Sequence, residues 1–219
     1  MLTDKLKNIP TKPGVYIYYD RQKKVLYVGK AKKLRNRVRS YFQKSRSLDP
    51  RLTLMISKIA DLEFIVTDTE VEALILEANL IKDKKPRYNV DLRDDKTFPY
   101  IRITAEDFPQ VFTTRKVIRD GSIYFGPYTN VKDMRDALTT LKGIFTIRSC
   151  KFDLNDTVVA NKKVQLCLDY YIQKCKGPCQ QYQSKESYSE MIVRVKEFLQ
   201  GKTTRLREEL VLEMQDLAS

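Results

Sequence analysis

The alternation of apolar and polar positions predicts two paired strands near the start of the chain. Residues 14–19 and 25–29 are rich in β-branched and aromatic side chains, and the polar segment 20–24 separates them. Two such runs joined by a short polar segment are typical of a β-hairpin. The apolar run 62–66 predicts a third strand of the same unit.

Helical spacing begins after Lys32, with apolar residues at Leu34, Val38, Tyr41 and Phe42. Asp49-Pro50 supplies a cap residue followed by proline, which predicts the start of a second helix. Thr69 and Glu72 form a capping-box pattern that opens a third helix, and the proline at 86 predicts its end near Lys84. The order strand, strand, helix, helix, strand, helix predicts a small unit with a mainly antiparallel sheet.

The rest of the chain has weaker patterns. Residues 98–103 and 110–114 alternate like strands, Asp120-Gly121 suggests a hairpin turn, and 131–142 has helical spacing. An amphipathic helix is expected over 191–199, ended by Gly201, and another begins near Leu206. We predict an α+β protein with four segments: 1–95, a β-hairpin and helix layer over 96–149, a cysteine segment over 150–183, and a helical tail over 184–219.

Charge narrows the class of partner. Lysine and arginine number 41 against 28 acidic residues, a net charge of +13. Residues 21–46 hold eleven of these cations and no acid. Such a run is either a solvated helix face or a phosphate-contacting face, and we interpret it as the latter, with Lys32, Lys33, Arg35 and Arg39 as DNA contacts.

No apolar run approaches the ~20 residues of a membrane span, and the first residues are too charged for a signal peptide. We therefore expect a cytoplasmic protein that does not contact membranes. Because that compartment keeps thiols reduced, the four cysteines are not expected to form disulfides.

Glu77 is unusual for its surroundings in the third predicted helix. Its one-turn neighbours Ala73, Leu74, Leu80 and Ile81 are all apolar. Burying an unpaired carboxylate is costly, and a bound cation would offset the cost. The alternatives are a surface position on the helix edge and an ion pair with a lysine.

The chain contains no histidine. A hydrolase built from it must use tyrosine, lysine or a carboxylate as base, and oxygen ligands for any catalytic metal.

These features resemble a known family. Gly14-Val15-Tyr16, Tyr27-Val28-Gly29 and Arg37 on the following helix are similar to the GIY-YIG nuclease core. Over essentially the whole chain the resemblance is to the UvrC family of bacterial excision-repair nucleases, carried by the motifs PGVY (13–16), LYVGKAK (26–32), LRNRV (34–38), EALILEANLIK (72–82), PRYNV (86–90), LRDDK (92–96), YFGPY (124–128) and CKGPC (175–179).

The resemblance implies a metal-dependent endonuclease that cuts damaged double-stranded DNA on the 3′ side of a bulky lesion, on DNA delivered by UvrB. It also implies that family members continue past Ser219 into a UvrB-binding hairpin and a second nuclease, so we expect an N-terminal part.

Roles follow as a hypothesis from the motif positions. Glu77 would bind Mg²⁺ or Mn²⁺, Tyr27 would be the base with Lys30 favouring its phenolate, and Arg37 would clamp phosphate oxygens. Tyr41 would position a phosphate, Tyr16 would line the cleft, and Asn89 would fix the site or the DNA by hydrogen bonds. Alternatively, Tyr16 and Tyr27 have only a structural role, because tyrosine is common in β-strands.

The four cysteines, Cys150, Cys167, Cys175 and Cys179, follow an irregular C-x16-C-x7-C-x3-C pattern. Zinc fingers usually show two close pairs, whereas only Cys175 and Cys179 are close here. The resemblance implies an iron–sulfur cluster of the [4Fe–4S] type; a Zn²⁺ site and buried free thiols are the alternatives.

A non-catalytic basic DNA-binding module with a structural metal or cluster site remains the rival function, and a sequence-specific GIY-YIG enzyme is a third.

Overall fold

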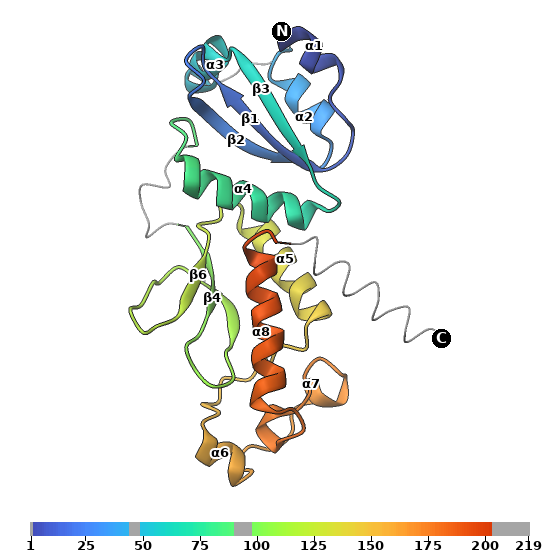
Figure 1. The fold of residues 1–219 in the computed structure, drawn as a ribbon, viewed down its shortest axis with the longest axis vertical. Coiled ribbons are helices and arrows are strands. Elements are labelled where there is room, and N and C mark those ends of the chain that lie inside the picture. Colours follow the sequence, from blue (N-terminus) through green and yellow to red (C-terminus); the bar gives the residue numbers. More distant parts are fainter. Residues whose placement is uncertain (1, 44–48, 90–97, 203–219) are drawn as a thin grey trace, which may run out of the picture. The chain divides into compact units, whose positions relative to one another are not determined.

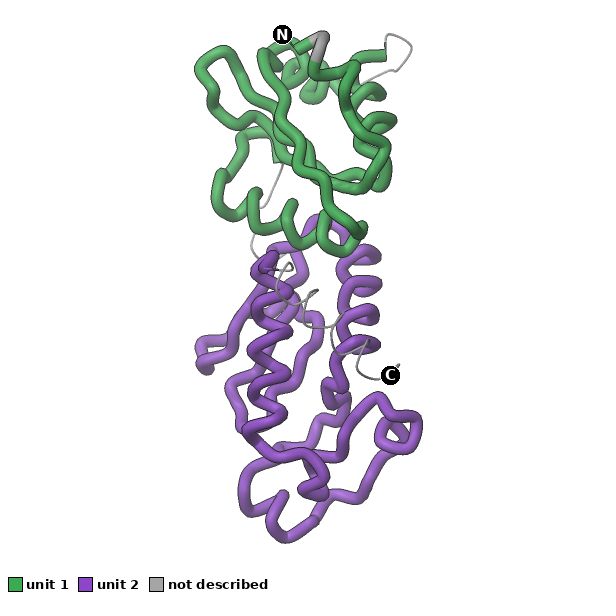
Figure 2. The backbone as a smooth tube through the Cα atoms, turned by 45° about the vertical axis from the view of Figure 1, so that its right-hand side comes forward, with its two compact units in different colours: residues 1–95 green, residues 96–219 purple. Residues whose placement is uncertain are grey.

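The structure is a computed structural model that describes residues 2–43, 49–89 and 98–202 (Figure 1). The chain divides into two compact units, 1–95 and 96–219 (Figure 2). Each unit combines a three-stranded antiparallel sheet with helices, which confirms the α+β class. The finer division of 96–219 stays a prediction. Among the described helices, none is both long and apolar enough to cross a bilayer.

Unit 1 has the predicted order of elements, preceded by one short helix. The elements are α1 (Leu2–Lys7), β1 (Gly14–Tyr19), β2 (Val25–Ala31), α2 (Leu34–Ser40), α3 (Pro50–Lys58), β3 (Asp61–Val66) and α4 (Glu70–Lys84). The sheet order is β2-β1-β3. β1 is therefore central, and β2 lies at an edge.

The central strand β1 buries both of its faces. Val15 and Ile17 pack with Ala73 and Ile81, so α4 covers one face. Tyr16, two positions from Tyr18, points with it to the other face, where α2 and α3 contribute the buried Leu34, Val38 and Met55. Figure 1 shows α4 across one side of this sheet. The motif tyrosines thus lie on the face opposite α4.

The predicted cap signals are confirmed. Asp49 accepts a hydrogen bond from the backbone N–H of Arg51, with Pro50 at the first helical position. Thr69 Oγ1 accepts from the N–H of Glu72 at 3.1 Å, and the Glu72 carboxylate accepts from the N–H of Asp68 at 3.0 Å. The capping box therefore fixes where α4 begins.

Unit 2 contains β4 (Tyr100–Ile103), β5 (Val111–Thr114), β6 (Ile123–Phe125), α5 (Val131–Ile144), α6 (Asp156–Ala160), α7 (Leu168–Tyr171), the 3₁₀ turn η1 (Pro178–Gln180) and α8 (Lys185–Leu199). Its core includes Ile101, Ile103, Leu141, Ile192 and Val195. The strand order is β5-β4-β6.

The prediction of a hairpin turn at Asp120-Gly121 is wrong. Gly121 does turn the chain, with φ at +81°. However, β5 and β6 both pair with β4, which lies between them, so this turn joins two strands that are not neighbours. The hairpin is β4–β5. The LRDDK motif at 92–96, Lys44, Arg46 and the helix expected from Leu206 fall outside the described residues.

Candidate active site in unit 1

Four tyrosines form a cluster on one face of the sheet. The ring centroids of Tyr16 and Tyr18 on β1, Tyr27 on β2 and Tyr41 after α2 lie 5.3–6.4 Å apart in every pair. The hydroxyls of Tyr16 and Tyr41 are 2.9 Å apart and share a hydrogen bond. Three of these residues were predicted to share a site. Tyr18 was not, although its alternation with Tyr16 is the signal that places it there.

The motif glycines are required by this cluster. Gly29 lies opposite Tyr16 in the β1–β2 ladder. A Cβ atom at Gly29 would lie 2.4 Å from the Tyr16 hydroxyl oxygen and 2.7 Å from Cε1 of Tyr27. A Cβ at Gly14 would lie 2.2 Å from the carbonyl oxygen of Ile65. Both glycines therefore make room for close packing rather than for a turn.

The outer edge of β2 is held by two of the predicted residues. Asn89 accepts a hydrogen bond from the N–H of Val28 at 2.7 Å and donates to the Val28 carbonyl at 2.6 Å. The Glu77 carboxylate accepts from the N–H of Lys30 at 2.9 Å. An edge strand exposes alternate N–H groups, and side chains here take the place of a neighbouring strand. Both residues are thereby fixed beside Tyr27.

Glu77 is buried, as its apolar neighbours predicted, with an exposed fraction of 8%. Within the described part of the chain, no three histidine, cysteine or acidic residues gather as a metal site. Among the described residues, a cation at Glu77 would therefore have fewer than three such protein ligands, and water would fill much of its shell. Mg²⁺ commonly keeps several waters and binds through one or two carboxylates, so this residue fits such an ion.

Arg37 lies on α2, beside Tyr41. The guanidinium carbon is 5.2 Å from the ring centroid of Tyr41, one helical turn further on. The side chain is exposed. A planar, permanently charged group that is anchored at an aromatic ring and open to solvent is suited to bind phosphate oxygens.

The tyrosine hydroxyls are held in their neutral form. Burial raises the pKa of Tyr27 well above its ordinary value, and Tyr41 and Glu77 raise it further. Burial also raises the pKa of Tyr16, with Tyr27 and Tyr41 adding to it. Arg37 lowers the pKa of Tyr27. The expected influence of Lys30 on the phenolate stays a prediction. The backbone N–H of Lys30 donates to the Glu77 carboxylate.

The four cations predicted to contact DNA have different surroundings. Lys32 is exposed and pairs with Glu70 at 2.8 Å, and Lys33 is the N-cap residue of α2. Arg35 Nε donates to the carbonyl of Ile9 at 2.7 Å, and Arg39 donates to that of Leu6 at 3.3 Å. The two arginines therefore help hold the N-terminal segment, a role that the charge pattern did not reveal.

The cysteine segment of unit 2 does not form a ligand site within the described structure. Cys175 and Cys179 are buried, Cys150 is half-buried and Cys167 is exposed. Burial raises the pKa of Cys175 and Cys179, and the neighbouring thiols raise it further. The thiols are thus close enough to affect one another, but no three meet as a metal-binding group among the described residues. The cysteine-bound cluster stays a prediction.

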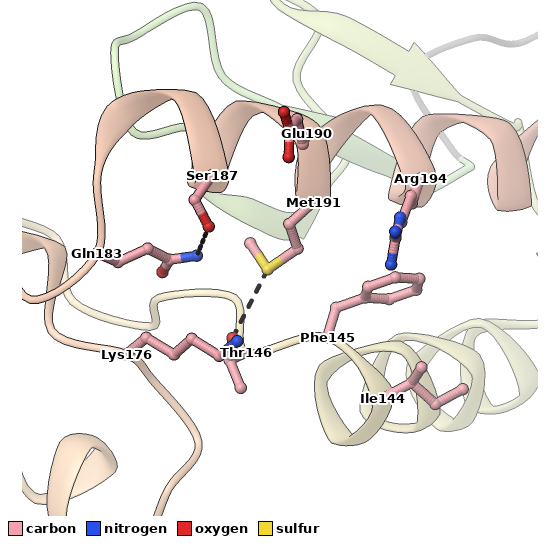
Figure 3. Close-up of a pocket in the computed structure, with 9 residues that line it drawn as sticks. All are labelled: Ile144, Phe145, Thr146, Lys176, Gln183, Ser187, Glu190, Met191 and Arg194. Carbon is pink, nitrogen blue, oxygen red and sulfur yellow. Dashed lines mark hydrogen bonds between the residues drawn. The ribbon is translucent and has the colours of Figure 1, made fainter. Parts of the chain in front are cut away.

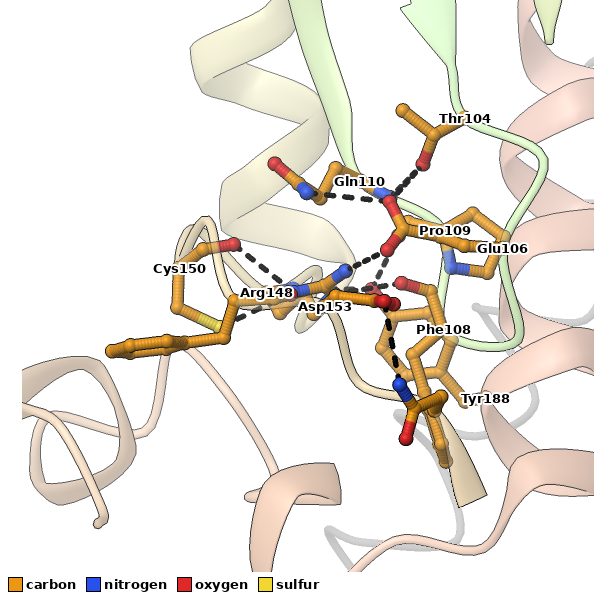
Figure 4. Close-up of polar contacts among 11 residues, drawn as sticks. Thr104, Glu106, Phe108, Pro109, Gln110, Arg148, Cys150, Asp153 and Tyr188 are labelled. Atoms are coloured by element: carbon orange, nitrogen blue, oxygen red, sulfur yellow. Dashed lines mark hydrogen bonds and ion pairs between the residues drawn. The ribbon is translucent and has the colours of Figure 1, made fainter. Parts of the chain in front are cut away.

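Arg148 is the polar centre beside that segment (Figure 4). Its side chain is fully buried; it donates to Glu106 at 2.6 Å, to the carbonyls of Phe108 and Phe152 at 2.7 Å each, and to the carbonyl of Cys150 at 3.1 Å. It also lies 3.5 Å from Cys150 Sγ. One arginine therefore ties the start of the cysteine segment to the β4–β5 loop.

Unit 2 also has a pocket of about 280 Å³, made by the end of α5, Lys176 and one face of α8 (Figure 3). Gln183 lines it, and its Oε1 is buried with no hydrogen-bond partner among the described residues. None of the predicted site residues lines this pocket.

Comparisons with known proteins agree with the motifs. The family model for the UvrC-like GIY-YIG domain matches residues 12–90, and that for the UvrC/Cho excinuclease middle domain matches 98–198. UvrABC system protein C of Chlorobaculum tepidum is 52% identical over 217 residues, which cover 99% of this chain and 35% of the relative. The Salinibacter ruber protein of the same name is 51% identical over 98% of this chain and 34% of its own length.

A solved structure is also similar to part of this chain. The GIY-YIG N-terminal endonuclease domain of UvrC from Thermotoga maritima, described as bound to its catalytic divalent cation, magnesium, is 42% identical. The match covers 40% of this chain and 94% of that domain, with a TM-score of 0.36. The chain spans about a third of the length of the curated relatives that it matches. With both UvrC domain types matched in order and half of its residues shared with these relatives, the chain belongs to the UvrC family.

Proposed function

We propose that this chain is a metal-dependent endonuclease of nucleotide excision repair that incises damaged DNA on the 3′ side of a lesion, together with UvrB. Family membership supports the repair role. One arrangement carries the nuclease assignment: the buried Glu77 of α4 accepts a hydrogen bond from the Lys30 N–H on β2, the strand that bears Tyr27, and Arg37 lies at the edge of the same tyrosine cluster.

Each group has a role that its surroundings support. A divalent cation held by Glu77, Mg²⁺ or Mn²⁺, would supply positive charge for a non-bridging oxygen and for the departing 3′-oxygen. Arg37 would bind another non-bridging oxygen and stabilise the charge that develops on the phosphate. Asn89 is a positioning residue, because it holds the Val28 backbone next to Tyr27.

Tyr27 is proposed as the base that takes the proton of the attacking water. Its phenolate is disfavoured by burial, by Tyr41 and by the Glu77 charge. Arg37 favours the phenolate, so the same cation would assist both the base and the phosphate. Tyr16 and Tyr41, which share a hydrogen bond, would orient the phenol and the scissile phosphate.

The rival function is a non-catalytic DNA-binding module with a thiolate-bound metal or cluster. The acid-free basic run over 21–46 and the mutual influence of the four thiols favour it. In both functions a [4Fe–4S] cluster, or alternatively Zn²⁺, would be structural or redox-sensing and would not be the site of cleavage. Iron, sulfide and zinc contents of protein purified without oxygen would decide between these cofactors.

The decisive test is incision of a duplex that carries one bulky adduct, in the presence of UvrB and Mg²⁺. Glu77→Gln keeps an oxygen acceptor for Lys30 N–H but removes the charge, and should slow incision on the order of 1000-fold. Glu70→Gln is the matched control, because Glu70 lies in the same helix, is exposed and pairs only on the surface with Lys32. A single 3′-side nick that is lost only in Glu77→Gln supports the nuclease; tight binding without a nick in wild type supports the rival.

A further inference from the structure

An exposed aromatic surface lies in the cysteine segment of unit 2. The side chains of Tyr171 and Tyr182 are 69% and 59% exposed, and Leu168 on α7 is 70% exposed. Tyr170 lies between the two tyrosines, with ring centroids 5.5 Å from each. We call Tyr170, Tyr171 and Tyr182 the tyrosine platform. Large aromatic side chains so open to water, and gathered rather than scattered, indicate a binding surface.

The charge around the platform selects the kind of partner. Residues 162–182 contain four lysines, Lys162, Lys163, Lys174 and Lys176, and a single acid, Asp169. The Asp169 carboxylate accepts a hydrogen bond from Ser149, and the lysines outnumber this single acid four to one. Gln180 donates to the Val164 carbonyl at 2.6 Å, which brings the loop with Lys162 and Lys163 against η1. The platform is therefore bordered by positive charge.

The platform is formed before any ligand arrives. The N–H of Tyr182 donates to the Gly177 carbonyl at 3.2 Å, and the N–H of Cys175 donates to that of Asp169 at 3.0 Å. Gly177 has φ of +68°, and a Cβ there would lie 3.0 Å from the Tyr170 ring. These contacts hold in place the backbone that carries the three rings. Binding therefore avoids the entropic cost of ordering this backbone.

We propose that the tyrosine platform binds an unpaired DNA strand, stacking bases on Tyr171 and Tyr182 while the lysines neutralise its phosphates. Aromatic faces interleaved with lysines are the combination that single-stranded nucleic acid requires. A duplex does not fit equally well, because the faces of its bases are covered by their neighbours. The site requires no cleavage, and so goes beyond the nuclease function proposed above.

A tryptophan reporter tests the contact directly, because the chain contains no tryptophan. Tyr171→Trp and Tyr182→Trp keep a stacking surface and each introduce a single fluorophore. Oligothymidine, added with a metal chelator so that no strand is cut, should quench both. Val117→Trp, at a position 55% exposed in the loop between β5 and β6, is the control and should not respond. Equal quenching at position 117, or none at 171 and 182 once anisotropy shows the oligonucleotide bound, would overturn the proposal.

Affinity gives a second measure. In chelator, Tyr171→Ser and Tyr182→Ser should each weaken oligothymidine binding about tenfold, the effect of losing one stacked base, while the phenylalanine variants stay within about twofold. Binding to a duplex of the same length should not change. A serine variant that behaves like its phenylalanine partner, or that weakens duplex binding as much, would exclude base stacking. Neither measurement depends on incision, so failure of the nuclease proposal leaves both interpretable.

Discussion

The tyrosine cluster of unit 1 and the cysteine segment of unit 2 hold their reactive side chains in different ways. In unit 1, Tyr16 and Tyr27 come from neighbouring strands and Glu77 from the middle of a helix, and hydrogen bonds fix their places. In unit 2, Cys150 and Cys167 lie outside regular elements, and Cys167 is exposed.

The two sites differ in whether a bound ligand is needed to bring their side chains together. Strands and helices that pack on a shared core place the groups of unit 1 without a ligand. The cysteine segment relies on local anchors such as Arg148, and its thiols gather as ligands only if a bound metal or cluster supplies the energy. Substitutions that remove the buried hydrogen bonds of Arg148 in unit 2, or that disturb the packing at Gly29 in unit 1, should therefore change the free energy of unfolding by different amounts.

The largest effect is expected from Arg148→Met. It leaves Glu106 and three carbonyls without their buried donor, which should destabilise unit 2 by about 3–5 kcal/mol in urea unfolding. Lys185→Gln is the control, because it removes an exposed pair with Asp107 in the same loop and should cost under about 1 kcal/mol. Equal effects of the two substitutions would show that Arg148 is not the anchor.

In unit 1, Gly29→Ala should cost about 1–3 kcal/mol, because the new methyl group would overlap the Tyr16 ring. Gly143→Ala in α5, where a Cβ meets nothing within 4 Å, should instead stabilise its unit by about 0.5–1 kcal/mol. Urea unfolding curves of both variants measure the contrast. If Gly29→Ala were neutral, the close packing of Tyr16 over β2 would be wrong.

The sequence predicted the elements of unit 1 well because its signals are local. The capping box at Thr69 marks the start of α4, and the apolar neighbours of Glu77 reveal that it is buried. Helix α1 was missed because Leu2–Lys7 is too short to show a helical period. In unit 2, the hairpin at Asp120-Gly121 was misjudged because strand order depends on pairing between distant segments, which local patterns do not contain.

The sequence motifs predicted the principal residues of the site better than the hydrogen bonds that hold those residues in place. Asn89 acts on Val28, 61 positions away, and only the fold brings the two together. Arg35 and Arg39 seemed equivalent to Lys32 in the basic run, yet they donate to backbone carbonyls of the N-terminal segment. Composition predicts the net charge of a segment. It does not predict which of its side chains already make hydrogen bonds within the protein.

The pH dependence of incision should distinguish the base from its neighbours. Because the pKa of Tyr27 is raised, its neutral form dominates near pH 7, and the rate should rise about tenfold per pH unit below that pKa. Tyr27→Phe should lose most of the activity and this slope. Tyr18→Phe is the control, since its buried hydroxyl has no hydrogen-bond partner in the described part of the chain. A pH slope that survives in Tyr27→Phe would assign the base elsewhere.

The smallest effects should separate two kinds of cation within the basic run. Lys32 is 78% exposed, so Lys32→Gln should change the unfolding free energy by less than about 1 kcal/mol. If Lys32 contacts a phosphate, the variant should also lower the salt slope of duplex binding by about one.

Arg35→Gln removes a donor to the carbonyl of the buried Ile9, and should cost about 1–3 kcal/mol of stability with little change in that slope. Anisotropy titrations over a range of salt concentrations, paired with urea unfolding, measure both quantities for each variant. A salt slope that falls in Arg35→Gln but not in Lys32→Gln would reverse the assignment, and would mean that the hydrogen-bonded arginine, rather than the exposed lysine, faces the DNA.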